Sequence, residues 1–337
     1  MMARRIGYAV LVLALIAAGA DVAYWKWAAD RMRYEIDAWV TDRAAEGWHV
    51  TMARPAIGGW PLAVTADLRG VSVTHGKMAG LQLPDVVLSV PLLRPTTLAL
   101  EFRGEQVIKI GDAPAMRLAG VPLAAEIPLP DPAGRPITLG GRDLRIEPES
   151  KAWIAHVATM DGHVVVANPG APVAFALQVE GIDLPDGVNW PLGRSIESAS
   201  VSGTLNGSLP PLNPTAAWAS AWRDGGGSVD VRQADIVWGP LKLTSTATLA
   251  LDDQLQPMGS ANAKASGYLE TLDRMAKAGL LTKSAATVAK AMLSLLAGTG
   301  SGDAPPEVEV PLTLQYRTLS MRQVPLVRFP ELDWPNQ

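Results

Sequence analysis

The sequence predicts a mainly β fold, antiparallel, with a small number of helices. Segments in which apolar and polar residues alternate recur along the chain, and each is bounded by Gly, Pro, Asp or Asn. Glycine and proline are frequent, at 31 and 27 of 337 residues, as in chains that turn often. Strands and helices do not alternate regularly, which disfavours a parallel, doubly wound sheet. We therefore expect either a curved sheet, such as a half-barrel, or a closed sandwich.

The N-terminus predicts a transmembrane helix. Arg4 and Arg5 precede an uncharged apolar run at residues 6–20. A helix that continues from this run through Trp25 has about 20 residues, which is enough to span a bilayer. Asp21 interrupts the apolar stretch, but the aromatic residues at positions 24, 25 and 27 suit a membrane–water interface.

This segment has two interpretations. Ala18-Gly19-Ala20 is an acceptable cleavage site, so the segment could be a secretory signal peptide. We expect instead an uncleaved anchor over residues 1–27, which contacts the membrane through residues 6–25. In both cases the basic pair stays inside and the chain after residue 27 is exported.

Further helices are predicted on either side of the strands. Residues 28–47 predict an amphipathic helix, because apolar side chains recur three or four positions apart and Gly47 can end the helix in a left-handed cap. A short helix is predicted at residues 215–223. Late in the chain, residues 267–297 predict a helical hairpin whose first helix ends at Gly279.

The other segments predict two β-rich regions, residues 48–227 and 228–337. The run at 225–227, three glycines, marks the boundary, either as a linker or as a hinge inside one domain. We expect the second region to continue the sheet of the first. Strands are predicted at residues 81–90, 97–110, 137–146, 153–167, 173–182, 228–251 and 308–317.

The clearest strand pattern lies in residues 241–251. Apolar residues mostly occupy the odd-numbered positions and polar residues the even-numbered ones, which is typical of a half-buried antiparallel strand. An apolar face of this kind could take a lipid chain, and the helical hairpin could cover its opening. The residues that we expect to line such a site are Leu241, Leu243, Leu249, Leu251, Leu272, Met275 and Met292.

The sequence offers little for catalysis or metal binding. It contains no cysteine, which excludes thiol catalysis and cysteine-ligated metals. His156 and His163 are the one close histidine pair, and Asp161-Gly162 between them predicts a hairpin turn that keeps them too far apart for one ion. Neither a Gly-x-Ser-x-Gly nor a Ser-x-x-Lys motif occurs. We therefore expect no catalytic residue, no metal and no cofactor.

The charge of the chain disfavours nucleic acid as a partner. The formal net charge is −4 and the isoelectric point is about 5.6. Proteins that bind nucleic acid usually carry a clustered basic face.

Several stretches carry a resemblance to a known family. They are the N-terminal anchor with the Trp-rich helix after it, the strand entry 58-GGWPL-62, the closing segment 308–330, and above all residues 236–281, IVWGPLKLTSTATLALDDQLQPMGSANAKASGYLETLDRMAKAGLL. Together these resemble an uncharacterised bacterial family, domain of unknown function 2125. Trp60 stands where the family favours Phe. The resemblance implies a membrane-tethered protein that faces the cell envelope, and it supplies no catalytic residue.

These observations lead to two functional hypotheses. The first is a single-pass protein of the bacterial inner membrane, with the bulk of the chain in the periplasm, that binds or transfers an apolar envelope ligand such as a lipid. The alternative is a structural or assembly factor of the envelope that acts through protein contacts, without ligand or catalysis. A continuous apolar groove would favour the first hypothesis and a filled core the second.

Overall fold

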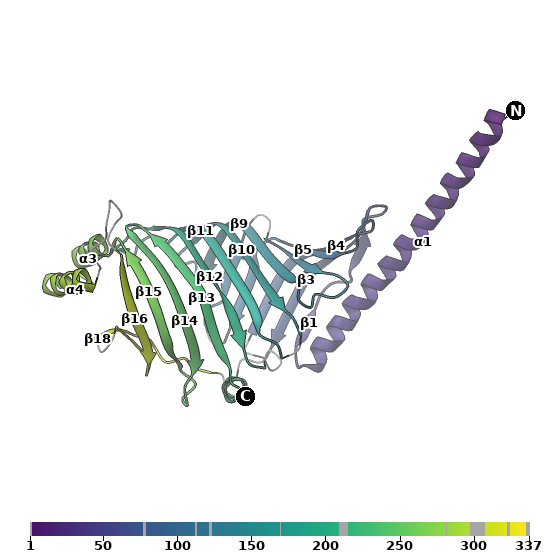
Figure 1. Ribbon diagram of the computed structural model, residues 1–337. Helices are drawn as coiled ribbons and strands as arrows, with labels where there is room; N and C mark the ends of the chain where they lie inside the picture. The colour runs from purple at the N-terminus through teal and green to yellow at the C-terminus, as the bar shows by residue number, and fades with distance from the viewer. Residues whose placement is uncertain are drawn as a thin grey trace. The chain divides into compact units, whose positions relative to one another are not determined.

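The chain forms two compact units in the computed structural model (Figure 1). Unit 1 comprises residues 1–112 and 122–131, and unit 2 comprises residues 113–121 and 132–337. The structure describes residues 2–76, 79–111, 113–120, 123–168, 170–208, 215–280, 282–296, 307–321 and 324–334. The fold is mainly β and antiparallel, as the sequence predicts.

Unit 1 begins with a long helix, α1 (Met2–Ala45), which joins the predicted anchor and the predicted amphipathic helix without a break. Gly47, with a φ of 87°, follows its last turn, as the sequence predicts. Across the part of the chain that the structure describes, no helix combines the length and the apolarity needed to cross a membrane.

The sheet of unit 1 is built around two long strands, β3 and β4, which pair along their whole length. Short strands β1 and β2 pair with β3, β5 and β6 pair with β4, and β8 pairs with β5, all antiparallel. The strands are β1 (His49–Thr51), β2 (Ala56–Gly58), β3 (Ala63–His75), β4 (Ala79–Pro91), β5 (Thr97–Arg103), β6 (Gln106–Ile110) and β8 (Leu123–Pro128).

The core of unit 1 lies between α1 and β3. The alternation of β3 buries Val64, Ala66 and Leu68 on one face. Ile36 of α1 packs against this face, in one cluster with Ala66 and Leu68. The amphipathic half of α1 is therefore a docking helix for the sheet.

Unit 2 is an antiparallel meander. Strands β9 to β18 pair in sequence order, each with the next, and β7 pairs with the free side of β9. The strands are β7 (Met116–Ala119), β9 (Pro136–Pro148), β10 (Ala155–Val166), β11 (Val173–Asp183), β12 (Ser195–Asn206), β13 (Ser228–Trp238), β14 (Leu241–Leu251), β15 (Pro257–Ser266), β16 (Val308–Gln315), β17 (Thr318–Met321) and β18 (Val324–Arg328). Most of these strands are joined to the next by a short connection, as in a meander. Longer segments join β12 to β13, through α2 (Ala216–Asp224), and β15 to β16, through α3 (Tyr268–Lys277) and α4 (Lys283–Leu296).

Among its described residues, unit 2 has the helices α2, α3 and α4. The helix α2 (Ala216–Asp224) is capped by Thr215, whose hydroxyl accepts a hydrogen bond from the backbone N–H of Trp218 at 3.2 Å. The helices α3 (Tyr268–Lys277) and α4 (Lys283–Leu296) form the predicted helical hairpin. Gly267, which precedes α3, has a φ of 71°, and a Cβ there would lie 1.8 Å from the carbonyl oxygen of Pro240, so only glycine fits.

The glycine run at 225–227 lies inside unit 2, between α2 and β13. The strands before and after it, β12 and β13, pair from Ile196–Trp238 to Asn206–Ser228. The residues on either side of the run therefore share one sheet.

The expected hairpin turn at Asp161-Gly162 is wrong. Both residues lie in the middle of β10, where Asp161 pairs with Gly140 of β9 and with Gln178 of β11. A strand that is paired on both sides satisfies its backbone N–H and C=O groups, and this outweighs the local preference of an Asp-Gly pair for a turn.

Candidate functional site

One face of the unit 2 sheet is apolar, and the register of β10 and β11 shows how it is built. Val164 pairs with Phe175, and Met160 pairs with Val179. Residues that are directly opposite in an antiparallel pair point to the same side of the sheet, so these side chains share a face. The residues between them, such as Asp161 opposite Gln178, point to the other side.

The same apolar face continues through the neighbouring strands. The pairings carry it from Leu177 to Val201 of β12, and from Val229 of β13 to Leu249 of β14. We call the following residues the apolar face: Ile137, Leu139, Met160, Val164, Phe175, Leu177, Val179, Ala199, Val201, Leu205, Val229, Val231, Ile236, Leu241, Leu243, Leu249, Ala261, Ala263, Ala265, Val308, Val310, Leu312 and Leu314.

The opposite face of the sheet is polar, and a cross-strand row of side chains on β12, β13 and β14 illustrates it. Asp235 accepts hydrogen bonds from the Thr244 hydroxyl at 2.7 Å, from the Gln233 amide at 2.7 Å and from the Ser200 hydroxyl at 3.3 Å. These donors, Thr244 first, lower the pKa of the Asp235 carboxyl, although partial desolvation acts in the opposite direction. The sheet therefore has one wet and one apolar side.

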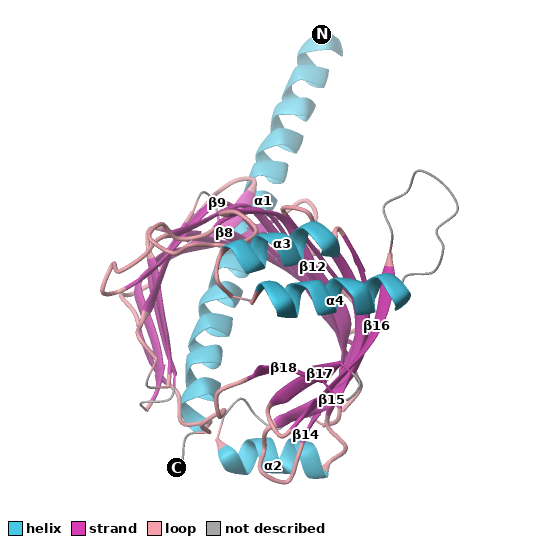
Figure 2. Cartoon of the chain, turned by 90° about the vertical axis from the view of Figure 1, so that its left-hand side faces the viewer, coloured by secondary structure: helices cyan, strands magenta, loops and turns pink. Residues whose placement is uncertain are grey.

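The helical hairpin covers the apolar face at β15 and β16. Tyr268 of α3 forms a buried cluster with Val308 and Val310, and Leu293 of α4 packs against this cluster. Val308 is 1% exposed there. Figure 2 shows that the sheet of unit 2 is curved, and Figure 1 shows α3 and α4 beside β16, at the end of the sheet.

Away from the hairpin, the apolar face keeps contact with solvent. Leu139 is 40% exposed, and Val164 and Leu177 are each 39% exposed. A closed sandwich would bury these positions as completely as Val308, because a second layer would lie over them. The described part of unit 2 therefore presents an apolar surface on a curved sheet, covered by helices at one side.

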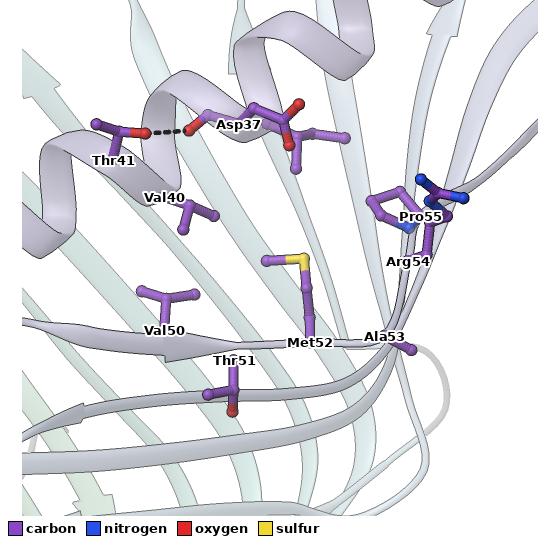
Figure 3. Close-up of a pocket in the computed structure, with 10 residues that line it drawn as sticks. Asp37, Val40, Thr41, Val50, Thr51, Met52, Ala53, Arg54 and Pro55 are labelled. Atoms are coloured by element: carbon purple, nitrogen blue, oxygen red, sulfur yellow. Dashed lines mark hydrogen bonds between the residues drawn. The ribbon is translucent and has the colours of Figure 1, made fainter.

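Unit 1 contains a recess between α1 and β1. It is an open groove of about 510 Å³, and Figure 3 shows Val40 of α1 above Val50 and Met52. Asp37 and Arg54 bring the charges that line it. The Asp37 carbonyl oxygen accepts a hydrogen bond from the Thr41 hydroxyl at 2.9 Å, within the helix. The side chains of Val40, Val50 and Met52 give the groove an apolar floor.

The structure places the predicted ligand-lining residues in two groups. Leu241, Leu243, Leu249 and Leu251 lie on one side of β14, half-buried, and the residues between them are mostly exposed, as the sequence predicts. Leu272 and Met275 lie half-buried on α3, whereas Met292 lies in α4 outside the residues whose side chains the structure describes. A role of these residues in binding a ligand stays a prediction.

Sequence reasoning missed two parts of this surface. The hairpin contacts the sheet through Tyr268 and Leu293, and Tyr268 could have been found as the large residue directly after the glycine that ends β15. The apolar rows of β9 to β12 were missed as well. In β11 the signal was present, because apolar residues at 173, 175, 177 and 179 alternate with smaller or polar ones.

The chemistry available to this surface is that of binding. Among the described residues, no group of three or more His, Asp or Glu side chains is placed to hold a metal ion. Neighbouring groups shift the pKa of Glu101, Arg103 and Asp235. Hydrogen bonding to Arg103 lowers the pKa of Glu101, and the same bond raises the pKa of Arg103; this is an exposed ion pair on β5. None of the three belongs to the apolar face.

Comparisons with known proteins agree with the family resemblance. No curated protein and no solved structure matches the chain. The model of one family, described as an uncharacterized protein conserved in bacteria, matches residues 25–330. The chain therefore belongs to this family, domain of unknown function 2125.

Proposed function

We propose that unit 2 binds an apolar ligand of the cell envelope, a lipid, on its apolar face. The observation that carries this proposal is the incomplete cover of that face, where Leu139, Val164 and Leu177 are each about two-fifths exposed on paired strands. Burying apolar surface contributes roughly 25 cal/mol per Å², so a curved apolar sheet this broad has a strong tendency to take up acyl chains. Soluble proteins rarely expose large continuous apolar patches, and those that they do expose often mark binding sites.

We further propose that α1 attaches the chain to the inner membrane and that both units lie in the periplasm. Leu13, Leu15 and Ile16 are 65%, 65% and 63% exposed, so the apolar side chains of this segment have little protein around them. Arg4 and Arg5 precede the segment, and positively charged flanks stay on the cytoplasmic side. This location would supply the lipid.

The binding test compares two substitutions on one strand. Leu177→Lys places a charge on the apolar face, whereas Ala176→Lys places the same charge on the polar face of β11, one residue away. A charge that is buried without a partner is costly, so we expect Leu177→Lys to lower the amount of bound lipid and Ala176→Lys to leave it unchanged. The full chain is purified in mild detergent, extracted with organic solvent and analysed by mass spectrometry.

The result can contradict the proposal in two ways. If the wild-type chain carries no more lipid than an exported β protein of similar size, the lipid proposal fails. If both lysine variants retain the same lipid as the wild type, the lipid binds elsewhere. In the first case the apolar face is better explained as a contact surface for another envelope protein, which crosslinking in cells would detect.

A further inference from the structure

Two loops lie together at one end of the unit 1 sheet. Residues 59–62 precede β3, and residues 92–96 follow β4. The backbone N–H of Leu92 donates a hydrogen bond to the carbonyl oxygen of Leu62 at 2.9 Å, which joins them. Their tips are apolar and face solvent, with Trp60 56% exposed, Leu62 69% exposed and Leu93 86% exposed.

These loops are held against α1 at one level of the helix. The indole N–H of Trp25 donates a hydrogen bond to the carbonyl oxygen of Ala63 at 3.0 Å. One residue from the exposed Leu93, Leu92 is buried in a cluster with Ala29 and Val64. The loops therefore have a fixed height along α1, close to Trp25.

At this height, α1 carries exposed aromatic side chains. Tyr24 and Trp27 are 42% and 63% exposed, and their rings stack with centroids 5.9 Å apart. Toward the N-terminus, the exposed side chains of α1 are apolar, among them Leu11, Leu13 and Leu15. An apolar helix followed by an aromatic girdle is the arrangement found where a chain leaves the hydrocarbon of a bilayer.

The charge of the loops fits the same surroundings. Residues 59–62 carry no charge, and Arg94 is the only charged residue in 92–96. A basic side chain beside apolar tips suits anionic lipid headgroups, whereas an acidic one would be repelled. Trp side chains favour the membrane–water interface and Leu side chains favour the hydrocarbon below it, so both residue types suit loops that insert into the membrane.

We propose that Trp60, Leu62 and Leu93 insert into the membrane–water interface and, with Tyr24 and Trp27, form a membrane-docking surface of unit 1. This inference rests on the proposed attachment of α1 to the bilayer. It adds a second contact, made by the loops, and two contacts hold the sheet of unit 1 at a defined orientation on the membrane. The surface would thus fix unit 1 on the bilayer instead of leaving it on a freely swivelling tether.

The test uses the absence of cysteine from the chain, because a single introduced cysteine takes a label at one known site. Leu62→Cys and Leu93→Cys are labelled with an environment-sensitive fluorophore in the full chain, reconstituted into vesicles of equal parts phosphatidylethanolamine and phosphatidylglycerol. Ile110→Cys is the matched control in unit 1. Ile110 is 66% exposed and pairs with Ala79, at the opposite end of β4. The 13 residues of β4 separate the two ends by about 40 Å, at roughly 3.3 Å per residue.

We expect a blue shift at positions 62 and 93, and loss of their fluorescence when the vesicles contain nitroxide-labelled lipid. The label at position 110 should behave as in water. Leu13→Cys reports on α1 alone. Quenching at 13 without quenching at 62 and 93 would overturn the docking surface and leave the anchor intact, and no quenching at 13 would contradict the anchor itself. A shift at 93 that occurs without vesicles and grows with protein concentration would instead identify a contact between copies of the chain, which also overturns the proposal.

Discussion

The indole Nε1 of Trp25 donates a hydrogen bond to the backbone carbonyl oxygen of Ala63, 3.0 Å away. Ala63 is the first residue of β3, the strand around which the unit 1 sheet is built. Trp25 also packs against the buried cluster of Ala29, Val64 and Leu92. One side chain thus joins the helix that we propose as a membrane anchor to the folded part of unit 1.

Replacing Trp25 by Phe should loosen this connection while keeping most of the packing. The substitution removes the indole N–H and leaves the Ala63 carbonyl oxygen without its hydrogen-bond donor. We therefore expect the packing of α1 against β3 to be destabilised by about 1 kcal/mol. Hydrogen exchange of the full chain should show faster exchange in residues 63–68 and in the first residues of the loop at 92–96. Trp27→Phe, at a position that is 63% exposed, is the control and should change neither. Equal protection in both variants would show that the hydrogen bond contributes nothing.

Two glycines on the apolar side of the sheet should respond in opposite ways to alanine. A Cβ at Gly203 would lie 2.3 Å from the carbonyl oxygen of Asp230 and 3.0 Å from Cζ of Phe175, so the pairing of β12 with β13 must shift. Such overpacking typically costs about 1–3 kcal/mol. A Cβ at Gly162 would make only ordinary contacts, the nearest at 3.4 Å to Leu177, and alanine there should be neutral or stabilise by about 0.4–1 kcal/mol.

Urea denaturation of the full chain in the two variants, followed by circular dichroism, measures this difference. Gly203→Ala should lower the midpoint, and Gly162→Ala should not. If Gly162→Ala were as destabilising as Gly203→Ala, the close approach of β12 to β13 would not be the cause, and the register of β10 would have to be reconsidered.

Asp235 should make stability depend on pH in the acid range. Hydrogen bonds, that of Thr244 first, lower its pKa in the folded state below the value of about 3.9 in an unfolded chain. The folded state therefore binds fewer protons, and its advantage is complete above about pH 4 and is lost as the pH falls through the lowered pKa. The wild type loses this stability in acid as Asp235 is protonated, and Asp235→Asn has no such group to protonate. The difference in unfolding free energy between wild type and variant should therefore shrink below about pH 4. A difference that stays constant with pH would contradict the lowered pKa.

The local parts of the fold were predictable from the sequence. The alternation of residues 241–251 gave β14 with its correct faces, and the periodicity after Gly267 gave the helical hairpin, because both signals depend on neighbours along the chain. The prediction at Asp161-Gly162 was wrong for the same reason. A turn preference is local, whereas the pairing of β10 with both β9 and β11 is made by distant segments.

The apolar face could be predicted only strand by strand. Each row, such as Phe175 and Leu177 on β11, is visible in the sequence, but their union into one surface depends on register, which β-bulges between Ser202 and Gly203 and between Val231 and Ala234 help to set. Whether a second layer covers Leu139 and Leu177 depends on the tertiary structure, which the pattern of a single strand does not contain. No periodicity distinguishes a strand in a closed core from a strand in an open trough.

The helical hairpin should act as a separable cover of the apolar face, and Leu293 tests this. Leu293 of α4 packs against the cluster of Tyr268, Val308 and Val310, so Leu293→Ser removes apolar contact where the hairpin covers the face. A fully buried Leu contributes about 1.5–3 kcal/mol, and Leu293 is partly buried, so we expect a loss near the lower end of that range. Val288→Ser, on the same helix at a position that is 56% exposed, is the matched control. Hydrogen exchange in α3, α4 and β16 should accelerate in Leu293→Ser alone, with β10 and β11 unchanged, because those strands are held by their own pairings. If β10 and β11 exchange faster as well, the hairpin belongs to the cooperative core of unit 2 and cannot open over a ligand without unfolding the sheet.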